Sequence, residues 1–204
     1  FRGEVQEGRP MSFTRFLGLA AAAAISLSAS ATLSLAAPLQ LKPADPQPKG
    51  LKPGLSVRYA YPSDVKTLRA AAKALEAGAE AGPPLKGLDY RDTNIGENAL
   101  TSKQSEMVAA DIRGYVKFDA PGVYTIDFLT NDGLRATIGG QVVGKFDGRQ
   151  PCEPTFAEEV QVPKAGWYPV HILYFQRLNT SCLHMRMAPK GSRPTWVANS
   201  AFGR

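Results

Sequence analysis

The chain has 204 residues, of which 44% are hydrophobic and 21% charged, and a formal net charge of +6. This length allows one domain with a substantial core and additional flanking segments. The basic residues are scattered and no nucleic-acid-binding motif accompanies them. The positive charge therefore indicates a solvated surface and excludes a dedicated nucleic-acid partner.

The first predicted element is an export signal. Arg15 forms a short basic region, residues 16–27 form an alanine-rich apolar run, and Ala29-Ser30-Ala31 fits the small-x-small cleavage rule, with Ser34-Leu35-Ala36 as a second candidate. A membrane anchor is the alternative, but serines dilute the run and no stop-transfer charges follow it directly. We assign residues 1–37 to upstream residues and a signal peptide. We expect a periplasmic or secreted protein without a stable membrane span after cleavage.

The mature chain is expected to begin with a linker. Residues 38–53 contain five prolines, which favour extended, unpaired backbone. A domain over residues 54–188 follows, and residues 189–204 are interpreted as a polar C-terminal tail. The domain opens with a short strand at 54–61, and residues 85–107 are expected to be irregular.

One helix is predicted in this domain. Val65, Leu68, Ala72 and Leu75 form an apolar stripe at helical spacing. Ser63 or Asp64 is the expected N-terminal cap, and Gly78 suits the C-terminal end.

The rest of the domain has the period-2 pattern of β-strands. Strands are predicted at 112–118, 123–129, 134–138, 141–146, 155–162, 167–176 and 181–187, joined by Gly- and Pro-containing turns. Many short strands with such turns indicate an all-β fold, an antiparallel β-sandwich with one short helix.

Residues 122–138 are predicted to form a β-hairpin with Asn131-Asp132-Gly133 at its exposed tip. An amide and a carboxylate on a rigid turn are a candidate cation and ligand site. Asp147 and Glu153, in the loop after the next strand, are candidate additional ligands. The alternatives are a turn whose residues are chosen for positive φ and an ordinary solvated loop.

The two cysteines, Cys152 and Cys182, are expected to form a disulfide, since the leader implies an oxidising compartment. Closing a loop of roughly 30 residues would stabilise the fold by about 3–4 kcal/mol. In the predicted strand at 181–187, Leu183 is expected to face the core. Cys182 and His184 lie on the opposite face of this strand and are expected to point outward. A zinc site is the alternative, but His171 lies on another strand and a structural zinc needs four ligands.

Five segments of the chain have the order and spacing of a known module. They are 114–116, 120–125, 130–135, 138–143 and 165–175. The pattern resembles the PA-fourteen domain, the β-sandwich module of anthrax protective antigen, yeast flocculins and bacterial β-glucosidases. The resemblance covers roughly residues 54–188. The resemblance implies the fold of this region. It does not by itself imply the function, because one fold hosts many functions.

In the sugar-binding members of that family, two consecutive aspartates at the hairpin tip, joined by a cis peptide, hold a calcium ion that contacts sugar hydroxyls. Asn131-Asp132 falls on this pair, so the resemblance implies Asn131 and Asp132 as calcium ligands. Asn131 offers a carbonyl oxygen without charge, which predicts a weaker site. Gly139 and Lys145 also stand where acidic residues are common in the family.

The function that these features predict is an exported carbohydrate-binding module, calcium-assisted, for cell-envelope or extracellular glycans. Its ligand-binding residues would be Asn131, Asp132 and Asp147. The alternative is a structural or protein-interaction module without a calcium or sugar site. We expect no enzyme, because no nucleophile elbow, His-Glu-x-x-His motif or phosphate loop occurs in the sequence.

Overall fold

The computed structural model describes residues 37–204. The predicted leader and both candidate cleavage sites lie outside the described residues. Residues 37–204 belong to one compact unit.

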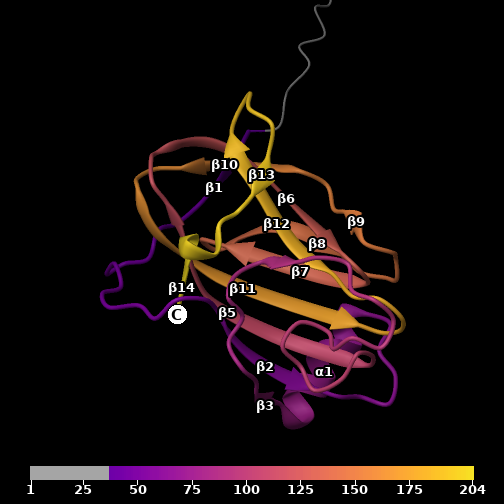
Figure 1. Cartoon of the computed structure of the whole chain (residues 1–204). Coiled ribbons are helices and arrows are strands. Elements are labelled where there is room, and N and C mark those ends of the chain that lie inside the picture. The colour runs from indigo at the N-terminus through magenta and orange to yellow at the C-terminus, as the bar shows by residue number, and fades with distance from the viewer. Residues whose placement is uncertain (1–36) are drawn as a thin grey trace, which may run out of the picture. The chain divides into compact units, whose positions relative to one another are not determined.

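The described chain forms two sheets and passes from one to the other several times along its length (Figure 1). Sheet A contains β1 (Leu39–Gln40), β4 (Asp89–Tyr90), β6 (Gly122–Thr130), β9 (Glu153–Pro154), β10 (Glu158–Val162), β12 (Leu183–Pro189) and β13 (Thr195–Trp196). Sheet B contains β2 (Ser56–Ala60), β3 (Glu80–Ala81), β5 (Val108–Phe118), β7 (Gly133–Ile138), β8 (Gln141–Phe146), β11 (Gly166–Gln176) and β14 (Phe202–Gly203). A helix, α1 (Leu68–Gly78), and a 3₁₀ turn, η1 (Asn199–Ala201), complete the elements. The predicted all-β sandwich with one short helix is confirmed.

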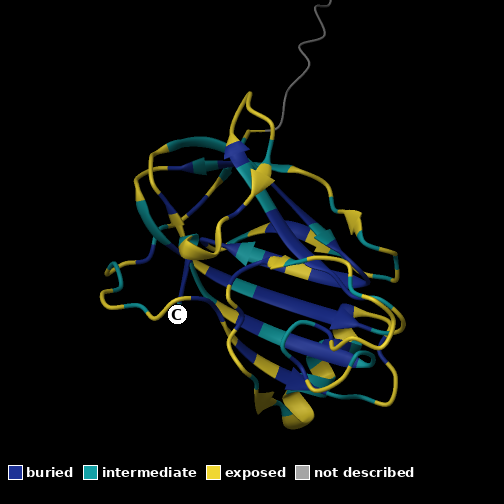
Figure 2. Cartoon of the chain, in the orientation of Figure 1, coloured by how far each residue is buried: buried dark blue, intermediate teal, exposed yellow. Residues whose placement is uncertain are grey.

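The core lies between the two sheets and follows the alternation of the strands (Figure 2). Sheet A contributes Ile126, Phe128 and Met185, and sheet B contributes Ile112 and Tyr168, all fully buried. Burying such side chains is the main favourable term in forming the sandwich.

The helix α1 covers part of the outer face of sheet B. Its Leu68 and Ala71 pack with Ala109 of β5 and with Leu173 and Phe175 of β11 in a second apolar cluster. This packing places the first helical turn at Leu68, so the expected cap at Ser63 or Asp64 is wrong. Thr67 is the N-cap, and its hydroxyl accepts a hydrogen bond from the backbone of Ala70 at 3.1 Å.

The predicted hairpin at 122–138 is wrong in its pairing, although its strands are present. The first strand, β6, pairs with β10 and β12 in sheet A, whereas the second, β7, pairs with β11 and β8 in sheet B. Asn131-Asp132 therefore carries the chain from one sheet to the other. Strand alternation does not specify the partner strand, and the core needs an apolar face from each sheet.

The segments at the two ends of the domain take part in the fold. Leu39-Gln40 pairs in parallel with β10, and Leu41 and Ala44 are buried, so residues 38–53 are not an unpaired linker. Backbone hydrogen bonds of 2.9 Å run in both directions between Lys52 and Arg204. The expected polar tail contains β13 and β14. Leu41 and Ala44 between the prolines, and Val197 and Phe202 near the C-terminal end, supply the buried contacts that hold these segments.

No helix within residues 37–204 is long and apolar enough to cross a bilayer.

Candidate functional site

The turn between the sheets is covered, not exposed as expected. Asn131 and Asp132 each have 5% of their surface exposed. The backbone N–H of Asn131 donates to the carbonyl of Cys182, and that of Asp132 donates to the carbonyl of Gln150, both at 3.1 Å. Two loops, after β8 and after β11, therefore close over the turn. Asp132 has φ of 58°, a left-handed conformation that Asp and Asn tolerate better than most residues.

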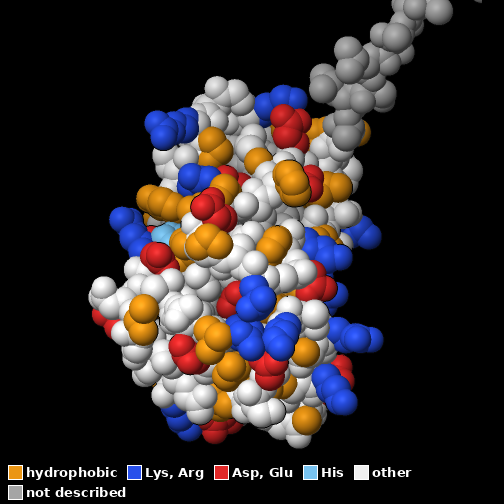
Figure 3. All heavy atoms as spheres, turned by 90° about the vertical axis from the view of Figure 1, so that its right-hand side faces the viewer, with side chains coloured by type: hydrophobic (Ala, Val, Ile, Leu, Met, Phe, Trp, Pro, Cys, Tyr) orange, Lys and Arg blue, Asp and Glu red, His pale blue; other side chains and the backbone are white. Residues whose placement is uncertain are grey.

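A polar cavity of about 400 Å³ opens beside this turn. Its walls come from the turn and from the same two loops, and the lining residues are Asn131, Asp132, Arg149, Gln150, Pro151, Arg177, Leu178, Asn179 and Thr180. On the side of the molecule toward which β11 runs, Lys and Arg side chains lie among Asp and Glu side chains (Figure 3). The cavity thus offers amide, carboxylate, guanidinium and hydroxyl groups, which are the groups that bind sugar hydroxyls.

Asp132 is the carboxylate of this cavity. Burial raises the pKa of Asp132, and this effect exceeds the opposing influence of the hydrogen bond from the backbone of Arg177, 2.7 Å long, and of the nearby Arg149. Arg177 is itself held by Asp64 at 2.8 Å, and hydrogen bonds from Lys66 and Arg177 lower the pKa of Asp64 to about 2. An ion pair with Asp64 therefore fixes one arginine of the cavity wall beside a desolvated acid.

These residues fit a calcium ion only weakly. Calcium takes six to eight oxygen ligands and favours several carboxylates. The turn supplies the amide oxygen of Asn131 and the carboxylate of Asp132, one of whose oxygens already accepts the Arg177 N–H. The guanidinium groups of Arg149 and Arg177 act on this carboxylate as positive charges. The Asn131–Asp132 peptide is trans, since the cis bond in the described chain joins Asp45 to Pro46.

The structure does not bring Asp147 to the cavity. Its carboxylate accepts a hydrogen bond of 2.7 Å from the backbone N–H of Leu68, at the first residue of α1. Asp147 therefore satisfies the start of the helix. Glu153 lies in β9 opposite Thr130, and its carbonyl accepts a hydrogen bond from Gln150.

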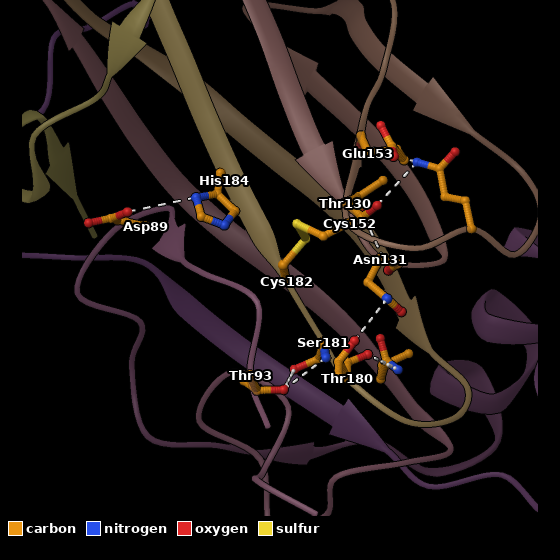
Figure 4. The surroundings of a disulfide bond; sticks show 12 residues. Asp89, Thr93, Thr130, Asn131, Cys152, Glu153, Thr180, Ser181, Cys182 and His184 are labelled. Atoms are coloured by element: carbon orange, nitrogen blue, oxygen red, sulfur yellow. Dashed lines mark hydrogen bonds and ion pairs between the residues drawn. A yellow bond between two sulfur atoms is a disulfide. The ribbon is translucent and has the colours of Figure 1, made fainter. Parts of the chain in front are cut away.

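The predicted disulfide between Cys152 and Cys182 is present (Figure 4), with the two Cα atoms 5.8 Å apart. Cys182 lies outside the main core that contains Leu183 and Met185, as expected, but it is fully buried, because the loop that carries Cys152 covers it. The bond fastens the loop that carries Gln150 to the segment that carries Thr180, two walls of the cavity. His184 lies beside the sulfur atoms, and its buried Nδ1 is 3.7 Å from Asp89. The oxidised cysteines leave no thiolates for the alternative zinc site.

Sequence reasoning missed most of the cavity lining. Arg149, Gln150, Arg177, Asn179 and Thr180 come from two loops whose approach to the turn depends on tertiary packing. A cue for the second loop existed in the Asn179-Thr180 pair directly after an apolar strand. Asn179 adopts φ of 68°, a turn conformation, and its N–H donates to Glu106 at 2.8 Å.

The comparisons with known proteins agree with this architecture. A family model described as the PA14 domain matches residues 90–196, more than half of the chain. The protein therefore belongs to the PA14 domain family, as the resemblance implied. No curated protein sequence matches it.

Solved PA14 domains share the fold at low sequence identity. The PA14 domain of the antifreeze protein MpAFP superposes with a TM-score of 0.60 at 16% identity, covering 78% of this chain and 94% of that one. A PA14 sugar-binding domain from an RTX adhesin gives 0.58 at 16% identity, covering 74% of this chain and 98% of that one. The epithelial adhesin 9 A domain of Candida glabrata, in complex with Galβ1-4GlcNAc, gives 0.60 at 15% identity, covering 81% and 94%.

Proposed function

We propose that this protein is an exported carbohydrate-binding module for cell-envelope or extracellular glycans, and that the sugar binds in the cavity at the Asn131-Asp132 turn. The observation that carries the proposal is the cavity itself. A carboxylate, three amides, two guanidinium groups and a hydroxyl converge at one turn, and a disulfide braces its walls. Preorganised polar groups in a concave site are typical of small-ligand binding.

The related folds support this proposal at the level of family. The RTX adhesin domain is described as sugar-binding, and the Candida glabrata domain was solved with a disaccharide. Export is supported by the leader pattern and by the disulfide, which persists in oxidising compartments. N-terminal sequencing of protein recovered outside the cytoplasm tests the cleavage site.

Calcium has a weak, accessory role in this proposal. Asn131 and Asp132 would supply two side-chain oxygens, and the bound sugar or water would supply others. The neighbouring guanidinium groups and the presence of a single carboxylate weaken calcium binding. We therefore expect a dissociation constant for calcium of about 10⁻⁴–10⁻³ M, the range of extracellular modules.

A glycan array with and without a chelator tests the proposal. We expect binding that Asp132→Asn and Arg149→Ala each weaken by about tenfold, since a hydrogen bond that involves a charged group commonly contributes about 1.5–3 kcal/mol. Arg193→Ala, at an exposed arginine in the β12–β13 connection, is the matched control and should bind like the wild type. Chelation should weaken binding only slightly, and Asn131→Asp should increase the response to calcium.

A structural or protein-interaction module is the second candidate. The burial of the turn, the replacement of the first acid by Asn131 and the adjacent guanidinium groups favour it. If no glycan binds, or if both cavity variants bind like the wild type, this second function replaces the first.

A further inference from the structure

The outer face of sheet B carries two rows of side chains beside α1, all of them polar except Leu173, which packs in the apolar cluster of α1. In the first row, Leu173 of β11 lies opposite Asp111 of β5 and Arg135 of β7. Arg58 of β2 extends this row beyond Asp111, and Lys145 of β8 extends it beyond Arg135. Residues paired in this way project from the same face of a sheet.

The second row runs parallel to the first, two residues along the strands. His171 of β11 lies opposite Arg113 of β5 and Thr137 of β7, and Ser56 of β2 lies beyond Arg113. Arg113 and Ser56 are exposed, and His171 is half-buried.

Positive charge dominates these rows. Arg58, Arg113, Arg135 and Lys145 are all exposed, whereas Asp111 is the one carboxylate in the two rows. Asp111 is already engaged by Arg113 at 3.0 Å and by His171 at 2.8 Å. In the described part of the chain, no ion pair is formed by Arg58, Arg135 or Lys145. Arg58 donates one hydrogen bond, to the backbone carbonyl of Ala79 at 3.2 Å. The face therefore has an excess of positive charge over negative charge.

The same face is hollowed. A shallow cavity of about 470 Å³ is lined by Arg113 and His171 and by the hydroxyl-bearing residues Ser56, Tyr115 and Thr137. Cations next to hydroxyl groups suit a sugar that carries both hydroxyls and a carboxylate or sulfate.

The spread of the charges indicates a polymer. Strands lie about 4.8 Å apart, so the row from Lys145 on β8 to Arg58 on β2 crosses four strand spacings, about 19 Å. One small anion would occupy the cavity without reaching both ends of the row. A lipid surface is less suitable, because Val142 is the large exposed apolar side chain next to these rows and bilayer binding needs several.

We propose that the outer face of sheet B binds an acidic polysaccharide through Arg58, Arg113, Arg135 and Lys145, at a site separate from the cavity of the Asn131-Asp132 turn. The hollow between Arg113 and Thr137 holds one charged sugar unit, and the flanking cations contact its neighbours along the polymer. Binding is electrostatic and calcium-independent. This site does not require the turn cavity to bind sugar.

Titration of the full mature chain with polygalacturonate oligosaccharides, with dextran as the neutral probe, tests this proposal. The variant with Arg135→Glu and Lys145→Glu should bind polygalacturonate about tenfold or more weakly, because two attractive charges become repulsive. Raising NaCl from about 0.1 M to about 0.5 M should weaken wild-type binding, since screening shortens the reach of exposed charges. Neither the wild type nor this variant should bind dextran through this face.

The matched control reverses one lysine and one arginine elsewhere: Lys49→Glu with Arg193→Glu, both exposed and both outside sheet B. It has the same net charge as the test variant and should retain wild-type affinity. Equal loss in both variants would show a nonspecific effect of net charge and overturn the proposal. Wild-type binding to anionic phosphatidylglycerol vesicles but not to polygalacturonate would overturn it as well. Asp132→Asn should leave polygalacturonate binding intact, which separates this site from the turn cavity.

Discussion

At position 132 a carboxylate is held in a covered turn, with 5% of its surface exposed and a hydrogen bond of 2.7 Å from the backbone of Arg177. Desolvation raises the pKa of Asp132 above its ordinary value of 3.8. The folded state therefore holds the proton more tightly than the unfolded state. The resulting stabilisation is fully present below the unfolded pKa and is lost as the pH rises through the folded pKa.

We predict that Asp132→Asn removes this pH-dependent contribution to stability, because asparagine does not titrate. Asparagine tolerates the positive φ at this position and keeps an acceptor for Arg177. As the pH rises from about 3.8 to 7, the wild type should lose stability relative to Asp132→Asn. Thermal melts across this range measure it. Parallel melting curves for wild type and Asp132→Asn across this range would contradict the prediction.

At the scale of the elements, α1 starts where two separate segments satisfy its free N–H groups. The hydroxyl of Thr67 accepts a hydrogen bond from the N–H of Ala70. The carboxylate of Asp147, in the loop after β8, accepts a hydrogen bond from the N–H of Leu68. The helix is short and depends on its apolar contacts with sheet B. Asp147 thus connects the helix to the sheet edge, a role that its sequence position does not indicate.

We predict that Thr67→Ala and Asp147→Ala each lower the free energy of unfolding by about 1 kcal/mol, the usual contribution of an N-terminal cap. Urea denaturation measures the loss. Asp147→Asn keeps a side-chain acceptor and should cost less than Asp147→Ala. Glycan binding should be unchanged in Asp147→Ala, because Asp147 does not line the cavity. Lost binding in a folded Asp147→Ala protein would return this residue to the ligand site.

At the scale of the whole domain, the first and last described segments lie side by side and close the sandwich. Lys52 and Arg204 exchange backbone hydrogen bonds, and Pro53 forms an isolated bridge with Gly203. Leu41, upstream, is 3% exposed and belongs to the main core. The domain therefore begins near residue 38, before the region that matches the family model.

We predict that Leu41→Ala lowers the free energy of unfolding by about 2–4 kcal/mol, as expected for deleting a buried leucine side chain. Lys49→Ala, on the exposed part of the same segment, should have almost no effect. Urea denaturation of both variants decides whether this segment is part of the cooperative unit. If Leu41→Ala and Lys49→Ala have the same free energy of unfolding, residues 38–53 are only a connecting segment and do not stabilise the domain.

Sequence pattern alone determined the strands, the helix and the family. Alternation of apolar residues placed β6, β7, β8 and β11 within one residue of their observed bounds, because period 2 follows from strand geometry itself. The predicted start of β5, at residue 112, is four residues later than the observed start at Val108. The cysteine pair followed from the count and the expected compartment. Gly139 and Gly140 form the hairpin turn between β7 and β8, and both adopt positive φ.

Tertiary structure decided which strands pair and what covers the turn. Alternation assigns a face to each residue but not a neighbour to each strand, so Asn131-Asp132 was predicted as a hairpin tip and proved to be a crossing between sheets. Its burial, the raised pKa of Asp132 and the cavity lining all depend on loops near 150 and 178 that are distant in sequence. The cation rows of sheet B likewise exist only because register aligns five strands. Such contacts are long-range, and a local pattern contains no information about them.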